Sequence, residues 1–202
     1  MRYVPITPDA LVDTVVEAVR GIDGYVVVGV DGADAAEPVR VAERIAAALR
    51  EPGRPAHTVA VRDFVRPASL RLEFGRTDEL SYRTAWFDYA AVRREVVSAL
   101  REHGRWLPAL WDERTDRSAR AATRTALPGT VLLVAGPMLL GRGLAFDHTL
   151  ALAMSESALR RKTPESDRWT IPALLRHDAE TTDTPTTFVR WEHPDRPALR
   201  VP

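Results

Sequence analysis

The sequence contains no cysteine and a single lysine, Lys162, among its 202 residues. The absence of cysteine excludes disulfides, zinc-thiolate sites and cysteine nucleophiles, and it is typical of proteins from a reducing compartment. A mechanism that needs a lysine has only this one candidate. Lys+Arg and Asp+Glu balance at 28 each, so the composition indicates neither nucleic acid nor an anionic membrane as a partner.

Long apolar runs are also missing. The longest, "VLLVAGPMLLG", is about half of the roughly 20 residues that a membrane span requires, and the first ten residues, "MRYVPITPDA", lack the apolar core of a signal peptide. We therefore expect a cytoplasmic protein with a small molecule as its partner, and a homo-oligomer stays open. The composition is ordinary for a globular protein, with 45% hydrophobic and 28% charged residues, and predicts a single α/β domain over 1–202.

Strand and helix patterns alternate along the chain. Thr7, Pro8 and Asp9 are typical of a helix start, and this N-terminal helix region occupies 1–24. Strands are predicted at 25–30, 56–62, 130–135, 148–154 and 186–191, and helices at 7–20, 38–50, 88–102, 155–163 and 171–180. This alternation predicts a mostly parallel central sheet with helices on both faces, and ligands at the carboxyl ends of its strands.

Three other segments are expected to surround the ligand. The connection over 63–87 is long and irregular, which is typical of a segment with ligand contacts. Residues 105–124 are predicted to form a hairpin arm, and residues 155–180 a lid-like region.

Six stretches in chain order resemble the uridine kinase group of P-loop kinases, over nearly the whole chain. They are "VVVGVDG", "VRDFVRP", "WFDYAAVRRE", "LWDERTDR", "VLLVAGPMLL" and "ALRRKTP". The resemblance implies a three-layer P-loop kinase-like domain with a small hairpin and lid. It also implies a phosphate-binding loop after the first buried strand.

That loop departs from the G-x-x-x-x-G-K-[ST] pattern at every functional position but one. Gly32 matches the first glycine, whereas Glu37 replaces the second glycine, Pro38 the lysine and Val39 the hydroxyl residue. In a working loop, backbone N–H groups and the lysine hold the phosphates and the hydroxyl binds magnesium. The sequence therefore predicts a degenerate loop, doubtful binding of ATP with magnesium, and no cofactor.

The resemblance fails at two further positions of phosphoryl transfer. Ala135 stands where the family has an acid at the end of a strand, so the second magnesium contact is missing as well. Arg62 stands at the family's catalytic base, and Asp63 lies one position later as a weak catalytic candidate.

The acceptor side of the resemblance retains more candidates for ligand binding. They are Asp63, Arg66, Asp88, Trp111, Asp112, Arg114 and Arg117. Asp88 is either a ribose contact or a helix N-cap, and Trp111 either a base contact or a core residue. The charges that follow Trp111 are either ligand contacts or a solvated hairpin. Phosphate or lid contacts are predicted at Arg160, Arg161 and Lys162, which are equally suited to the last turn of a helix.

No metal site is predicted. The five histidines, at 57, 103, 148, 177 and 193, lack the close spacing of metal ligands on one helix. The leading hypothesis is a uridine kinase-like protein without ordinary ATP-dependent phosphotransfer that binds a nucleoside, nucleotide or small hydroxylated ligand. Three alternatives stay open: a divergent enzyme that uses carboxylates and lid arginines, an active uridine kinase with an unorthodox phosphate grip, and a partner-binding module.

Overall fold

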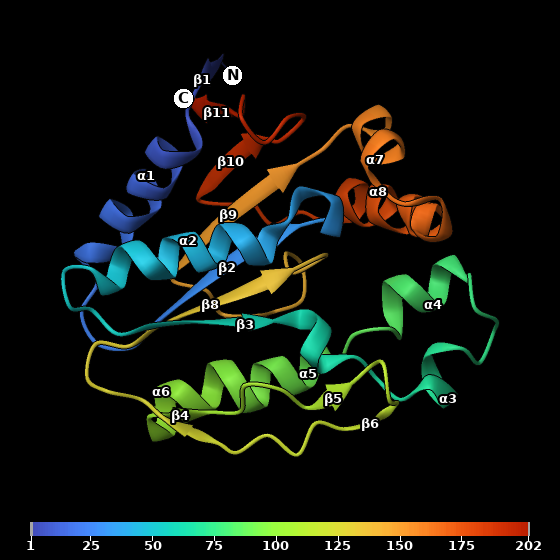
Figure 1. Cartoon of the computed structure of the whole chain (residues 1–202), viewed down its shortest axis with the longest axis horizontal. Coiled ribbons are helices and arrows are strands. Elements are labelled where there is room, and N and C mark those ends of the chain that lie inside the picture. Colours follow the sequence, from blue (N-terminus) through green and yellow to red (C-terminus); the bar gives the residue numbers. More distant parts are fainter. Residues whose placement is uncertain (1, 202) are drawn as a thin grey trace.

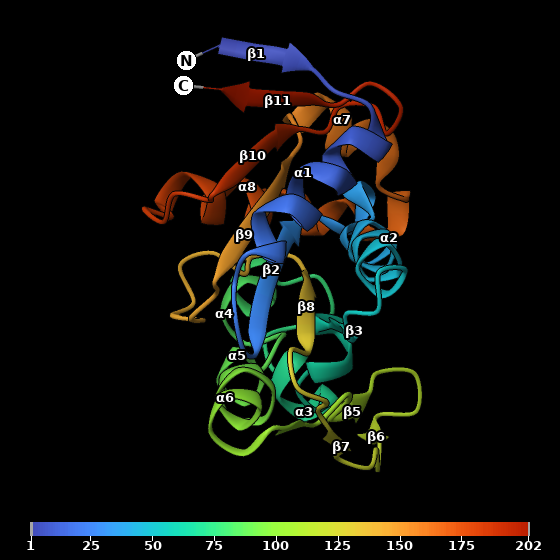
Figure 2. The same cartoon turned by 90° about the vertical axis from the view of Figure 1, so that its left-hand side faces the viewer.

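The computed structural model describes residues 2–201, and its centre is a seven-stranded sheet. The strands are β1 (Arg2–Pro5), β2 (Val26–Gly32), β3 (Ala56–Ala60), β8 (Val131–Gly136), β9 (His148–Ala153), β10 (Thr187–Arg190) and β11 (Ala198–Val201). Their order across the sheet is β1-β11-β10-β9-β2-β8-β3. The five strands from β10 to β3 are parallel. At one edge, β11 pairs antiparallel with β10, and β1 pairs antiparallel with β11 (Figure 2).

Helices cover both faces of this sheet (Figure 1). One face carries α1 (Pro8–Arg20) and α2 (Pro38–Arg50), and the other carries α5 (Tyr89–Ala91), a π-helical segment (Val92–Ser98) and α6 (Ala99–His103). Four helices lie beyond the carboxyl ends of the strands: α3 (Ala68–Arg71), α4 (Glu79–Thr84), α7 (Glu156–Lys162) and α8 (Ile171–Glu180). The 3-10 turns are η1 (Asp34–Ala36), η2 (Val61–Phe64) and η4 (Glu165–Thr170).

Two small hairpin-like pairs complete the fold. They join β4 (Arg105–Trp106) to β7 (Arg124–Thr125), and β5 (Trp111–Asp112) to β6 (Arg117–Ser118). Trp106 is buried against the π-helical side of the sheet, whereas Trp111 is only partly covered. The arm predicted over 105–124 therefore contains one core tryptophan and one partly exposed tryptophan.

The alternation of side chains along β2 divides the core into two layers. Val26, Val28 and Val30 pack with α1 and α2, whereas Val27 packs with the π-helical segment. Because successive side chains of a strand point to opposite faces, a continuous apolar run is what a doubly covered strand requires. The fold class expected from the sequence is confirmed: a mostly parallel sheet with helices on both faces.

Most predicted element starts agree with the structure. Thr7 caps α1 by accepting the N–H of Ala10 at 3.1 Å, and Ser155 caps α7 through the N–H of Ala158 at 3.3 Å. The strand predicted over 56–62 ends earlier, at Ala60, because the chain turns into η2. The prediction missed β1 and β11 altogether.

None of the helices within residues 2–201 is long and apolar enough to cross a membrane.

Candidate functional site

The loop after β2 occupies the position of a phosphate-binding loop, but its amides bond within the loop itself. The N–H of Ala36 donates to the carbonyl of Ala33 at 2.8 Å, and the N–H of Glu37 donates to that of Asp34 at 2.9 Å. The next residue, Pro38, has no N–H to donate. Three successive positions therefore offer no free amide to an anion.

Glu37 adopts an unusual backbone conformation at this place. Its φ of 54° and ψ of 50° lie in the left-handed region, which glycine tolerates far better than a residue with a Cβ. At the position where the P-loop pattern has its second glycine, the turn therefore has a conformation that glycine adopts readily. The Glu37 carboxylate pairs with Arg40 at 2.8 Å, one turn into α2.

A chain of ion pairs runs from this loop to the hairpin. The Arg62 guanidinium, in η2, pairs with Asp34 through Nε at 3.2 Å and with Glu113 at 3.3 Å. Burial opposes the charge on Arg62, but the two carboxylates outweigh that effect and raise its pKa. Arg71 continues the chain, at 3.0 Å from Glu113 and 3.5 Å from Asp116.

The cleft beside these ion pairs has a volume of about 740 Å³. It lies between the loop after β2, the ends of η2 and α4, the hairpin, and the segment that joins α7 to α8. Its polar side chains are Asp34, Glu37, Arg62, Glu113, Lys162, Thr163, Asp167, Thr170 and His193. The cleft therefore presents acids and bases side by side, rather than the excess of positive charge that suits a triphosphate.

Three aromatic rings form one wall of the cleft. Tyr82 lies 5.3 Å from Trp169 and 5.5 Å from Trp86, measured between ring centroids, and the two tryptophans are 5.2 Å apart. The Arg71 guanidinium covers Trp86 at 5.1 Å from its centroid. Burial raises the pKa of Tyr82 well above its usual range, so its hydroxyl stays protonated and can donate a hydrogen bond.

Of the predicted lid residues, Lys162 lines this cleft and the two arginines do not. Arg160 pairs with Glu156 at 2.7 Å, and Arg161 donates to the carbonyl of Glu192 at 3.3 Å.

Four of the predicted ligand residues meet in a separate hollow of about 300 Å³ on the hairpin, which Arg62 and Glu113 join to the cleft: Asp63, Trp111, Asp112 and Arg114. The Asp112 carboxylate accepts the N–H of Arg114 at 2.9 Å and the hydroxyl of Thr115 at 2.8 Å, and these bonds lower its pKa. Burial raises the pKa of Asp63.

The remaining predicted residues, Asp88, Arg66 and Arg117, lie elsewhere. Asp88 caps the helix after it by accepting the N–H of Ala91 at 2.9 Å. Arg66 is partly buried, and its carbonyl accepts a hydrogen bond from Arg71 at 2.6 Å. Arg117 is exposed on β6, opposite Asp112. Asp88, Arg66 and Arg117 line neither the cleft nor the hollow.

Sequence reasoning missed the aromatic wall and the partners of Arg62. Tyr82 and Trp86 are four residues apart in "SYRTAW", a spacing that puts two rings on one side of a helix and could have revealed them. Trp169 and Glu113 come from distant parts of the chain, and no local signal marks their approach. Residues 2–201 contain no cluster of three or more His, Asp or Glu side chains placed to hold a metal ion.

Comparisons with known proteins agree on the fold. A structure described as a possible uridine kinase from Bacillus stearothermophilus has a TM-score of 0.64 at 15% identity, covering 85% of this chain and 95% of that one. A structure described as a candidate fructose transport system kinase from Silicibacter sp. TM1040 has a TM-score of 0.65 at 18% identity, with coverages of 89% and 98%. The structure of the YGR205w protein has a TM-score of 0.55 at 12% identity, covering 89% of this chain and 92% of that one.

No protein-family model and no curated protein matches the chain. The structural matches, all below 25% identity, show the fold alone, and it is a P-loop kinase-like α/β fold. More narrowly, the fold is uridine kinase-like.

Proposed function

We propose that the protein is a uridine kinase-like protein that lacks ordinary ATP-dependent phosphotransfer and binds a nucleoside, nucleotide or small hydroxylated ligand in the cleft. The observation that carries the proposal is the state of the loop after β2. Its Asp34 carboxylate is paired with Arg62, and its amides at Ala36 and Glu37 are bonded within the turn.

Electrostatics supports this reading of the loop. A phosphate at this place would approach Asp34 and Glu37 without a loop lysine to compensate them, because Pro38 occupies that position. Each pair of like unit charges at about 4 Å costs about 1 kcal/mol in water and about 4 kcal/mol at an effective dielectric of 20. Opening the Asp34–Arg62 pair to admit phosphate would add to that cost.

The aromatic wall favours a ligand with a planar ring. Aromatic faces stack on nucleobases, and a base on a ring contributes about 1–3 kcal/mol. Asp167 and Thr170 lie on the same side of the cleft as Trp169 and can accept hydrogen bonds from ligand hydroxyls.

Isothermal titration calorimetry tests the proposal with uridine and with ATP plus magnesium as separate ligands. We expect measurable uridine binding that weakens at least about tenfold, or about 1.4 kcal/mol, in Trp169→Ala. Phe74→Ala removes a 71% exposed ring elsewhere and serves as the matched control. Micromolar, magnesium-dependent ATP binding would overturn the proposal, and so would uridine binding that Trp169→Ala leaves unchanged.

A second candidate function is favoured by the position of Lys162 in the same cleft as the loop. In this candidate the protein is an active kinase, and Lys162 replaces the missing loop lysine. Turnover of labelled ATP with uridine, lost in Lys162→Ala and kept in the neighbouring Arg160→Ala, would support it. Absence of turnover across nucleosides would end it.

A further inference from the structure

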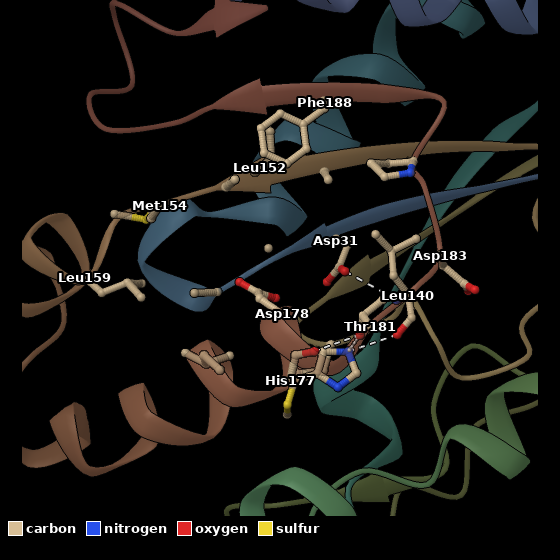
Figure 3. A pocket seen from close by; sticks show the side chains of 17 residues that line it. Asp31, Leu140, Leu152, Met154, Leu159, His177, Asp178, Thr181, Asp183 and Phe188 are labelled. Carbon is tan, nitrogen blue, oxygen red and sulfur yellow. Dashed lines mark hydrogen bonds between the residues drawn. The ribbon is translucent and has the colours of Figure 1, made fainter. Parts of the chain in front are cut away.

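A second cavity, of about 240 Å³, lies beside the cleft between the sheet and α8 (Figure 3). Asp31, Ala151 and Phe188 line it from β2, β9 and β10, where they are side by side in the register of the strands. From α8, His177 and Asp178 line it from the other side. Two small side chains of β9, Ala151 and Ala153, also line this space.

Asp31 is the most buried charged group of this cavity. The residue is only 8% exposed. Its carboxylate accepts the N–H of Leu139 at 3.1 Å and that of Leu140 at 3.3 Å. Within residues 2–201, no arginine, lysine or histidine forms an ion pair with it. Figure 3 shows Asp31 and Asp178 directed into the same space from the sheet and from α8.

Arg142, the cation whose charge acts on Asp31, is held by other groups. Arg142 donates to the carbonyls of Arg83 at 2.6 Å and Met138 at 3.1 Å, and it stacks on Tyr89 at 4.5 Å from the ring centroid. It therefore cannot reach the carboxylate without breaking these contacts.

The other titratable groups around Asp31 add no positive charge. His177 lies 2.9 Å from the carbonyl of Leu140 through Nε2, and burial lowers its pKa, so the ring is neutral and donates there. Asp178 and Asp183 are acids, and Tyr89 is buried with a raised pKa. The pKa of Asp31 is raised to about 7, chiefly by burial; the charge of Asp178 acts in the same direction, and the two amide bonds and the charge of Arg142 oppose the shift.

We propose that this cavity is a binding site for a small organic cation, a primary amine with a short branched aliphatic tail. Its ammonium group donates to Asp31 and Asp178, and its tail packs on Leu152, Met154, Leu159 and Phe188. A buried carboxylate without a paired cation, at one end of a mostly apolar space, favours a ligand with this combination of groups.

The volume of the cavity and the negative charge of its side chains argue against other classes of ligand. A volume of about 240 Å³ is below the roughly 300–1,000 Å³ of drug-sized sites, so a nucleotide does not fit. Three carboxylates, from Asp31, Asp178 and Asp183, disfavour an anion. Residues 2–201 offer no set of three ligands here for a metal ion.

This site is independent of the proposed function. Ala33 and Leu174 line both the cavity and the cleft, but Asp31 lines the cavity and not the cleft, and Arg62 lines the cleft and not the cavity. An amine site can therefore exist whether or not the cleft binds uridine.

Calorimetry with isopentylamine, and with isopentyl alcohol as its neutral analogue, tests the proposal. The amine stays protonated at about pH 8 and at about pH 5.5, whereas Asp31 is ionised mainly at the higher value. We expect the amine to bind at least about tenfold more tightly than the alcohol at about pH 8. The preference should shrink at about pH 5.5.

Three variants decide between outcomes. Asp31→Asn should abolish the preference for the amine, and Asp13→Asn, a matched change on the exposed side of α1, should leave it intact. Ala151→Leu should fill the cavity and weaken both ligands while the protein stays folded. Equal binding of amine and alcohol by the wild type would overturn the proposal, and so would an amine preference that survives in Asp31→Asn.

Discussion

Asp31 and Asp34 lie three residues apart at the carboxyl end of β2, but their surroundings are opposite. Asp34 is paired with Arg62 at the edge of the cleft, where both side chains are nearly half exposed. Asp31 is buried, has no cationic partner within residues 2–201, and faces an apolar cavity. Water screens the charge of Asp34 and a cation balances it. The Asp31 carboxylate is instead stabilised by hydrogen bonds from two backbone amides.

This difference indicates at which of the two carboxylates a bound ligand could stabilise the fold. An exposed pair contributes about 0–1 kcal/mol, and little changes when it opens. A buried, unpaired carboxylate destabilises the fold whenever it ionises, and a bound cation removes that penalty. The following predictions order the two regions by the size of the effect expected from each.

The largest effect is expected from Asp31→Asn as a function of pH. Burial raises the pKa of Asp31 from 3.8 to about 7, so the folded state holds this proton more tightly than the unfolded state. Its contribution to stability is therefore fully present below pH 3.8 and is lost as pH rises through about 7, by about 4 kcal/mol in total. At about pH 8, the variant should be more stable than the wild type by about 2–4 kcal/mol, after about 1 kcal/mol for a weakened amide bond.

Urea denaturation at about pH 5 and about pH 8 measures this difference. The gain in Asp31→Asn should grow with pH, and Asp13→Asn should show no such growth. A gain that is the same at both pH values would mean that Asp31 is not a buried, raised carboxyl. The contrast with Asp34 would then disappear.

The next effect distinguishes a packed position from an open one on β8 and β9, the two strands on either side of β2. Ala135, on β8, is fully buried in the core, whereas Ala151, on β9, lines the cavity. Adding a leucine side chain to a packed core typically costs about 1–3 kcal/mol. We expect that cost for Ala135→Leu and less than about 1 kcal/mol for Ala151→Leu, measured by thermal unfolding. Equal costs would show that the cavity does not accept a side chain.

Much of the fold could be predicted from the sequence because its signals are local. The run "YVVVGV" gives a strand buried on both faces, and Thr7 and Ser155 mark helix starts through their own side chains. The strands β1 and β11 have no such signal. They are four residues each, pair only with one another and with β10 at the sheet edge, and alternate too briefly to be recognised.

The candidate site was less predictable because distant segments build it. The altered loop could be found from Glu37, Pro38 and Val39, since a motif is a contiguous pattern. Asp31 stands one residue before that motif, and its position in the sequence marks it only as a carboxylate near the expected phosphate; its burial depends on the loop at Leu139 and Leu140. Sequence spacing does not encode such a contact.

A smaller effect should come from the backbone of the loop itself. Glu37 is in the left-handed region, where a residue with a Cβ is strained by about 1–2 kcal/mol. Glu37→Gly should therefore stabilise the protein by up to about 1 kcal/mol once the greater freedom of unfolded glycine is deducted. Glu43→Gly, in the middle of α2, should instead destabilise it by about 0.5–1 kcal/mol. Chemical denaturation of both variants measures whether each change raises or lowers the free energy of unfolding. A loss of stability in both variants would refute the strain at Glu37.

The smallest effect is expected at the ion pair of Arg62 with Asp34, at the edge of the cleft. A double-mutant cycle with Arg62→Gln and Asp34→Asn should give a coupling free energy below about 1 kcal/mol, because both side chains are nearly half exposed and salt screens them. The exposed pair of Arg160 with Glu156, on α7, provides the reference at about 0.3–0.5 kcal/mol. A coupling above about 2 kcal/mol that persists in high salt would mean that Asp34 is desolvated in the way that Asp31 is. The two carboxylates would then differ only in having a partner, and exposure would no longer explain the contrast between them.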